Sequence, residues 1–444
     1  MNWFQRVNQS LLLIGDFVLF YGALALTLYI RYGDAFYGPL LEIHLVPFTV
    51  MFFVWIVIFY IAGLYDFYAA QSTLELTRTL ISTILIAGSI AMGLFYVIPS
   101  FGITPKTNLL IFIGIFTLFE YWWRKSFNTR ITSIEAPYRV LLIGQGQSVD
   151  AITVSLKEAP HRGYQIVYSM NGLDDPEFNH LAQIILDKKV NLIALQAHIK
   201  KDAHAARKIY QNLALGIEVI NLADLYETLF KRVPLAELEE VWFLENLIKQ
   251  HRIYETIKRP VEAILATVLF IILSPFLLLI VLLIRLTSRG ASIYTQTRVG
   301  GKGKQFTLYK FRTMRSDAEA HGPQWSGKDD ARVTFIGKIL RHTHLDELPQ
   351  LLNIIKGNIS FVGPRPERPE FVEELKHTIP YYEIRHLVKP GLTGWAQINY
   401  RYGSSINDAY QKLQYDIYYL KNRSILLDIA ILTRTIKLFF INVE

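Results

Sequence analysis

The chain has 444 residues, 51% of them hydrophobic, and a mean hydropathy of +0.24, so we expect two or three domains and contact with a membrane. The formal net charge of +8 suits anionic lipid headgroups or phosphorylated substrates, and the long apolar segments favour these partners over nucleic acid, which we do not expect the protein to bind. The absence of cysteine excludes disulfides and thiolate metal sites.

Apolar stretches dominate the first part of the chain. Each approaches the roughly 20 residues that a helix needs to cross a bilayer. Residues 1–130 are therefore predicted to form a four-helix transmembrane bundle, because four such runs with so few charges are hard to house in a soluble core. Asp16 is expected to face other helices, since a carboxylate facing lipid would be costly. The predicted spans are Leu11–Ile30, His44–Leu64, Leu80–Ile98 and Asn108–Trp123.

Basic residues set the orientation of this bundle. The loops after the first and third spans carry only Arg31 and Lys106, whereas a dense basic group follows the fourth span. Lys and Arg accumulate on the cytoplasmic side of a membrane, so the rest of the chain is predicted to be cytoplasmic. The basic group is Arg124, Lys125, Arg130 and Arg139.

Residues 131–250 alternate between strand-like and helical segments, which predicts an α/β domain with a parallel, Rossmann-like sheet. A strand running into Gly144 and Gly146 resembles a dinucleotide fingerprint, but Val149 stands where the third glycine belongs. No acidic residue for a ribose ends the second strand. A regulatory or oligomerising role is therefore better supported than cofactor binding. The expected strands are 138–143, 164–169, 190–195 and 217–220.

A fifth apolar run, Val261–Ile284, has basic residues on both flanks. Its centre contains Ser274 and Pro275, and proline removes a backbone hydrogen bond and bends a helix. The Ser274 hydroxyl can help to satisfy the carbonyls that this frees. A bent helix that enters one leaflet and returns fits the two basic flanks, and an ordinary kinked span is the alternative. The residues alone leave both open.

Two adjacent carboxylates, Asp346 and Glu347, are the centre of the functional argument. Pro349 is tolerated near a helix start and Gly357 is a natural stop, so both acids are predicted to lie at a helix N-terminus, where anions are favoured. Adjacent side chains project about 100° apart on a helix, so one can meet substrate while the other holds a metal ion. The alternative is a pair that only complements the helix dipole.

Basic residues surround this pair in the sequence. Each alone is more typical of a solvated surface charge, but together they are interleaved with rigid Gly/Pro turns. Arg365 stands between two prolines, which suits bidentate phosphate binding. The candidate substrate-binding residues are Lys310, Arg312, Arg341, Arg365 and Arg385.

Residues 290–444 resemble the bacterial sugar transferase family, the polyprenyl-phosphate glycosyl-1-phosphate transferases. The resemblance rests on several motifs in the same order: residues 310–314 (KFRTM), 345–353 (LDELPQLLN), 362–366 (VGPRP) and 389–397 (KPGLTGWAQ). The four-span bundle and the Rossmann-like middle resemble the family's long, exopolysaccharide-type form. Residues 251–444 are therefore expected to be a mainly α (α+β) monotopic catalytic domain with a re-entrant membrane helix at 261–284.

The resemblance also implies roles for individual residues. It places the nucleophile on Asp346, a Mg²⁺ ligand on Glu347, phosphate-binding arginines on Arg341 and Arg365, and the break of the re-entrant helix on Ser274 and Pro275. His344, at a position that is commonly Ser, and Asn358, where an acid is common, depart from the family pattern.

The implied reaction transfers a sugar-1-phosphate from a UDP-sugar to polyprenyl phosphate and releases UMP, as the first step of exopolysaccharide, capsule or O-antigen synthesis. We expect the protein in the bacterial inner membrane with its catalytic domain on the cytoplasmic face. The bundle and the soluble domain are compatible with a homodimer.

Two other functions compete with this interpretation. A membrane-anchored nucleotide-sugar dehydratase needs a Tyr-x-x-x-Lys pair, and Tyr254 with Lys258 has that spacing. A non-catalytic scaffold of a polysaccharide assembly complex needs no dyad, whereas Asp346 and Glu347 are both present.

Overall fold

The computed structural model divides into two units, and each is described by itself: residues 1–145, 149–193 and 207–219 form one, and residues 146–148, 194–206 and 220–444 form the other. The described residues are 3–65, 73–97, 106–134, 138–158, 163–173, 175–247, 252–288, 290–315, 318, 332–400, 403 and 405–441.

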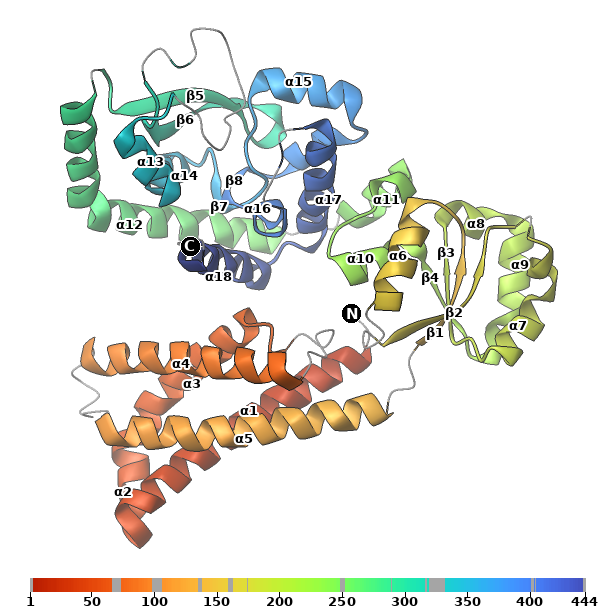
Figure 1. The fold of residues 1–444 in the computed structure, drawn as a ribbon, viewed down its shortest axis with the longest axis horizontal. Coiled ribbons are helices and arrows are strands. Elements are labelled where there is room, and N and C mark those ends of the chain that lie inside the picture. Colours follow the sequence, from red (N-terminus) through yellow and green to blue (C-terminus); the bar gives the residue numbers. More distant parts are fainter. Residues whose placement is uncertain are drawn as a thin grey trace. The chain divides into compact units, whose positions relative to one another are not determined.

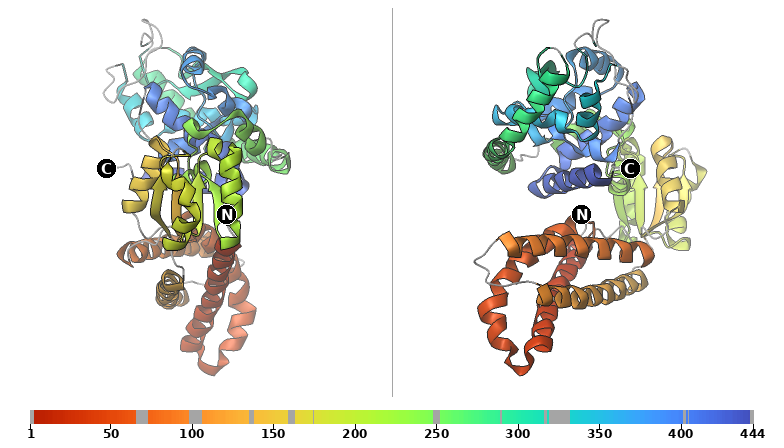
Figure 2. Two further views of the ribbon diagram at one scale, coloured as in Figure 1. Left: turned by 90° about the vertical axis from the view of Figure 1, so that its right-hand side faces the viewer. Right: turned by 60° about the vertical axis from the view of Figure 1, so that its left-hand side comes forward.

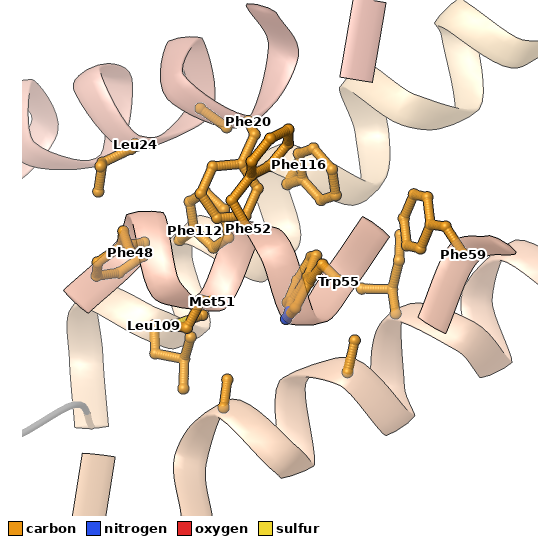
Figure 3. Close-up of a cluster of buried hydrophobic side chains, with 14 of the residues drawn as sticks. Phe20, Leu24, Phe48, Met51, Phe52, Trp55, Phe59, Leu109, Phe112 and Phe116 are labelled. Atoms are coloured by element: carbon orange, nitrogen blue, oxygen red, sulfur yellow. The ribbon is translucent and has the colours of Figure 1, made fainter. Parts of the chain in front are cut away.

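Long helices build the N-terminal bundle, and aromatic side chains fill its core. Phe20, Phe48, Trp55, Phe112 and Phe116 meet there (Figure 3), with Phe112 and Phe116 stacked at 5.6 Å between ring centroids. The helices are α1 (Trp3–Tyr32), α3 (Leu45–Ile61), α4 (Thr73–Val97) and α5 (Lys106–Ile134), with the short turns η1 (Gly33–Phe36), α2 (Tyr37–Pro39) and η2 (Leu40–His44) joining α1 to α3.

Membrane-capable helices are present, but their number differs from the four predicted spans. Among the described residues, three helical stretches are long and apolar enough to cross a bilayer: Ser10–Tyr60, Leu76–Tyr96 and Tyr254–Thr287. The first contains the predicted span Leu11–Ile30 and most of the predicted span His44–Leu64. Asn108–Trp123 lies within α5, which does not meet the same criterion, so the four-span count stays a prediction.

Asp16 is buried among the helices, as predicted. Its Oδ2 accepts hydrogen bonds from Arg124 Nη2 at 2.6 Å and from the Tyr65 hydroxyl at 2.5 Å. Arg124 also donates to Glu120 Oε2 at 3.1 Å and to the Leu64 carbonyl. This cluster ties α1, α5 and the turn after α3 together.

The predicted strands of the middle segment are confirmed. They form one sheet in the order β2-β1-β3-β4, with β1 parallel to β2. In Figure 1, α6 lies on one face and α7 and α9 lie on the other. This arrangement fits the predicted α/β domain, and its classification as Rossmann-like stays a prediction. The elements are β1 (Tyr138–Ile143), α6 (Gln147–Glu158), β2 (Tyr164–Met170), α7 (Leu181–Asp187), β3 (Leu192–Leu195), α8 (Ala197–Lys201), α9 (Ala203–Asn212) and β4 (Glu218–Asn221).

Two helices after this sheet, α10 (Leu222–Phe230) and α11 (Glu240–Leu247), belong to the second unit. Val233 N donates to the Gln414 carbonyl at 3.2 Å, and Trp395 Nε1 donates to the Lys231 carbonyl at 2.8 Å. The segment between them therefore packs on the C-terminal part of the chain. The domain boundaries at 130 and 250 stay predictions.

The apolar helix α12 (Arg252–Thr287) is continuous and contains Pro275. Figure 1 and the right-hand view of Figure 2 show it as two arms that meet at a bend. Ser274 Oγ donates to the Ile271 carbonyl at 2.7 Å, and this is the carbonyl four residues before Pro275, which the missing proline N–H leaves open. Ala266 on one arm and Ile284 on the other both pack against the same unit.

The remaining elements pack against both arms of α12 and form the motif-rich part of the chain. An antiparallel hairpin of β5 and β6 leads into short helices, and β7 pairs in parallel with β8. The elements are β5 (Ile293–Val299), β6 (Gln305–Phe311), α13 (Phe335–His342), η9 (Leu345–Gln350), α14 (Leu351–Ile355), β7 (Ser360–Val362), α15 (Pro369–Thr378), η10 (Tyr382–Leu387), β8 (Gly391–Thr393), α16 (Trp395–Asn399), α17 (Ile406–Asn422) and α18 (Ile425–Ile441).

Candidate active site

The element η9 presents the two carboxylates, and β6 fixes its position. His344 adopts a left-handed conformation (φ 52°) that turns the chain from α13 into η9. Asn353 in the following helix α14 is fully buried; its Oδ1 accepts from Tyr309 N at 3.1 Å and its Nδ2 donates to the Thr307 carbonyl at 2.7 Å. A single amide side chain thus fastens α14, and with it η9, to the strand that carries Lys310.

Glu347 receives two cations on one oxygen. Lys310 Nζ lies 2.7 Å from Glu347 Oε1, and Arg365 Nη2 lies 3.0 Å from the same atom. Burial by itself would raise the pKa of Glu347, but Lys310 and Arg365 together lower it well below its ordinary value. Glu347 is therefore ionised at neutral pH, and it holds two phosphate-binding candidates in place.

Asp346 is placed differently from its neighbour. Its side chain is 8% exposed, and among the described residues it makes no hydrogen bond or ion pair. Burial raises the pKa of the Asp346 carboxyl, while Lys310 opposes the rise. A carboxylate that stands in a field of cations without being tied to one keeps its lone pairs available for attack.

The loop that carries Arg365 is held by its backbone. The Arg365 carbonyl accepts from Arg385 Nη2 at 2.9 Å, and the Pro366 carbonyl accepts from Arg298 Nη1 at 3.0 Å. Backbone amides hold the two flanking carbonyls, with Gly391 N donating to Pro364 and Val299 N donating to Glu367, both at 2.9 Å. Four successive carbonyls are thus satisfied, which leaves the loop little freedom.

Close backbone contacts explain the glycines of two motifs. A Cβ on Gly363 would lie 2.4 Å from the Lys389 carbonyl oxygen, and one on Gly394 would lie 2.2 Å from the Gly363 carbonyl oxygen. A Cβ on Gly391 would likewise lie 2.1 Å from Gly363 N. These glycines therefore pack β7 against β8 and align the arginine loop.

The predicted substrate-binding residues do not all gather at the dyad. Lys310 and Arg365 meet at Glu347, and Arg341 contributes to the field at Asp346 while its Nε donates to Thr313 Oγ1 at 2.9 Å. Arg312 donates instead to the Ser288 carbonyl and hydroxyl at the end of α12.

Arg385, another predicted substrate-binding residue, is buried and pairs with Asp416 at 3.0 Å. Its contact with the site is the hydrogen bond from its Nη2 to the Arg365 carbonyl. Arg298, which the sequence analysis did not single out, holds the same loop. Burial lowers the pKa of its guanidinium to about 10, and Arg365 and Arg368 add to that shift. The alternation of half-buried Tyr294, Gln296 and Arg298 on one face of β5 is the pattern that could have found it.

The implied metal ion can be tested against the donor set. Among the described residues no three His, Cys, Asp or Glu side chains gather into a metal cluster. The carboxylate of Glu347, the predicted ligand, still fits Mg²⁺, because this ion binds through one or two carboxylates together with waters and substrate phosphates.

A membrane-capable helix, a buried carboxylate and convergent cations beside it are the features expected of a membrane-associated protein that acts on phosphate groups. Residues 253–442 match the model of the family "Bacterial sugar transferase". An exopolysaccharide production protein of Rhizobium leguminosarum bv. phaseoli is 39% identical over 189 residues, which cover 40% of this chain and 93% of that protein. The chain belongs to the bacterial sugar transferase family.

Two longer relatives have more specific names. UDP-N-acetylgalactosamine-undecaprenyl-phosphate N-acetylgalactosaminephosphotransferase of Aeromonas hydrophila is 40% identical over 221 residues, covering 50% of this chain and only 52% of that protein's length. UDP-glucose:undecaprenyl-phosphate glucose-1-phosphate transferase of Klebsiella pneumoniae is 27% identical over 408 residues, covering 86% of each chain. The similarity to the second extends over most of this chain.

Proposed function

We propose that this protein transfers a sugar-1-phosphate from a UDP-sugar to undecaprenyl phosphate and releases UMP. The observation that carries the proposal is the contrast within the dyad: Glu347 binds Lys310 and Arg365, while Asp346 is buried beside them and has no direct partner in the described part of the chain. Relatives named for N-acetylgalactosamine phosphate and for glucose phosphate transfer leave the sugar open.

In the proposed first step, an Asp346 oxygen attacks the β-phosphorus of the UDP-sugar. The bond from this phosphorus to the bridging oxygen breaks, UMP departs with that oxygen, and the sugar phosphate remains on the aspartyl oxygen. In the second step an oxygen of the lipid phosphate attacks the same phosphorus and Asp346 leaves as a carboxylate. Both steps bring anions together, so Lys310, Arg341 and Arg365 stabilise the charge that develops.

Glu347 would hold Mg²⁺, which would supply further neutralisation of the diphosphate charge. Helix α12 is proposed to be re-entrant: its two arms contact the same unit, so a helix that dips into one leaflet brings the site to the headgroup plane. With the positive-inside orientation, this plane is the cytoplasmic face of the inner membrane. We further propose that this transfer initiates exopolysaccharide, capsule or O-antigen synthesis. We also propose that the protein is a homodimer.

The dehydratase alternative is weaker. Lys258 Nζ does lie 2.9 Å from the Tyr254 hydroxyl, as that chemistry requires. Both groups, however, are engaged by Asp428: Tyr254 donates to it at 2.6 Å and Lys258 pairs with it at 2.8 Å. The pair is part of a polar network that joins α12 to α18.

The test is UMP release by the full chain in nanodiscs, with a panel of UDP-sugars, undecaprenyl phosphate and Mg²⁺. We expect release that requires lipid acceptor and metal, and the panel names the sugar. A wild-type protein that is silent with every donor would leave the scaffold function standing, and bound nicotinamide in the purified protein would favour the dehydratase.

A further inference from the structure

A second group of cations lies at the C-terminal end of α14, the helix that follows the dyad-bearing element η9. Gly357 follows α14 in a left-handed conformation (φ 74°), and it is flanked by two basic side chains from distant parts of the chain. A Cβ built on Gly357 would lie 3.5 Å from Lys389 Nζ and 3.6 Å from Arg259 Nη2. The two cationic groups therefore lie within about 7 Å of each other, close enough to repel.

Neither cationic group is paired within the described part of the chain. The side chains of Lys389 and Arg259 make no ion pair or hydrogen bond with any described residue. The neighbouring acids are engaged elsewhere: Glu255 pairs with Arg423 at 3.1 Å, and Glu262 accepts from Ser360 Oγ at 2.6 Å. Burial and the charge of Arg259 lower the pKa of Lys389, although Glu262 and Glu255 oppose the shift.

The surroundings of Arg259 and Lys389 indicate which kind of anion could bind to them. Arg259 comes just before the apolar stretch of α12, and Lys389 comes two residues after Leu387. Exposed apolar side chains accompany both: Val261 is 54% exposed and Leu387 is 61% exposed. Basic groups beside exposed apolar groups are the pattern of a surface at the level of lipid headgroups.

The pair is separate from the dyad. The strongest charged influences on Asp346 are Lys310, Glu347, His344 and Arg341, whereas those on Lys389 are Arg259, Glu262, Glu255 and Lys258. The Lys389 backbone packs against two glycines: its Cα lies 3.4 Å from the Cβ position of Gly301, and its carbonyl oxygen lies 2.4 Å from that of Gly363. An ammonium group beside a guanidinium group can bind a tetrahedral anion.

We propose that Arg259 and Lys389 bind the phosphate headgroup of an anionic membrane phospholipid and so set the height of the catalytic unit at the bilayer surface. This inference goes beyond the proposed transfer reaction, because it concerns a lipid that is not consumed.

The experiment measures lipid retention by the full chain with native mass spectrometry in non-ionic detergent. The protein is titrated separately with short-chain phosphatidylglycerol, phosphatidylcholine of the same tails, a short polyprenyl phosphate and inorganic phosphate. The variants are Arg259→Gln, Lys389→Gln and the double substitution, and the matched control is Lys200→Gln, which removes an exposed charge from α8.

We expect the wild type and the control to retain phosphatidylglycerol in preference to phosphatidylcholine, and the double variant to bind it at least about tenfold more weakly. Three results would overturn the proposal. Equal retention by the double variant would mean that the two cations only complement the end of α14. Equal binding of inorganic phosphate would show that no lipid is recognised, and retention of polyprenyl phosphate alone would assign the cations to the acceptor.

Discussion

Two charge clusters in this protein use similar residues with opposite balance. In the bundle, the buried carboxylates of Asp16 and Glu120 share the single guanidinium of Arg124, which also donates to a backbone carbonyl. At the dyad, Lys310 and Arg365 converge on Glu347, and Asp346 has no direct partner among the residues that the structure describes.

This difference separates a structural cluster from a chemical one. In the bundle every charged group of the cluster has a partner, so the cluster stabilises the contact between the helices. Removal of the Arg124 cation would leave Asp16 and Glu120 without their positive partner. At the dyad, two cations share the single carboxylate of Glu347 among the described residues, so they can also attract an anionic substrate. The comparison predicts that substitutions in the bundle act on stability and that substitutions at the dyad act on turnover.

The largest effect is expected for Asp346→Asn. The amide is isosteric but is a poor nucleophile, so UMP release should fall by about 10³-fold or more while the thermal midpoint stays near that of the wild type. Glu347→Gln should lose activity as well, but with a lower midpoint, because Lys310 and Arg365 lose their shared anion. Wild-type turnover by Asp346→Asn would mean that the dyad only complements the helix start.

In the bundle, Arg124→Met should reduce stability by about 3–5 kcal/mol, because it leaves Asp16 and Glu120 buried without a cation. Asp16→Asn should cost less, since one acid remains for Arg124. Differential scanning fluorimetry in detergent reports the shifts, and Lys125→Gln, on the exposed side of the same helix, is the control. If Arg124→Met unfolds at the wild-type temperature, the cluster does not join the helices.

Arg298→Gln tests whether the arginine loop must be held. Loss of the bond to the Pro366 carbonyl should let Arg365 move, and a small misplacement lowers kcat by about 10- to 100-fold with little change in the KM of the UDP-sugar. Arg298→Lys should recover only part of the activity, because a single ammonium cannot hold both Pro366 and Gln296 in the same geometry. Hydrogen exchange of residues 360–372 should rise in Arg298→Gln, and unchanged exchange with full kcat would contradict the clamp.

Sequence patterns predicted the local features of this molecule. The strands of the middle sheet, the dyad at the start of η9 and the bend at Pro275 each depend on a few consecutive residues. Arg298 and Arg385 escaped correct assignment because their roles depend on tertiary contacts: Arg298 meets Pro366 across 68 residues, and Arg385 was predicted to bind substrate, although burial directs it to a backbone carbonyl. The direction of Arg312 toward Ser288 is likewise set by packing and not by its motif.

The smallest predicted effect concerns the pH dependence of activity. The attacking form of Asp346 is the carboxylate, and burial raises its pKa, so activity should rise with pH along an acid limb above the ordinary range of an aspartate. Lys310 is the strongest opposing influence, and Lys310→Gln should therefore move this limb to higher pH as well as lower its height. Lys338→Gln, on the exposed side of α13, should leave the limb in place. Because a loss of folded protein would scale the whole profile without moving it, a shifted limb identifies Lys310 as a group that acts on the nucleophile.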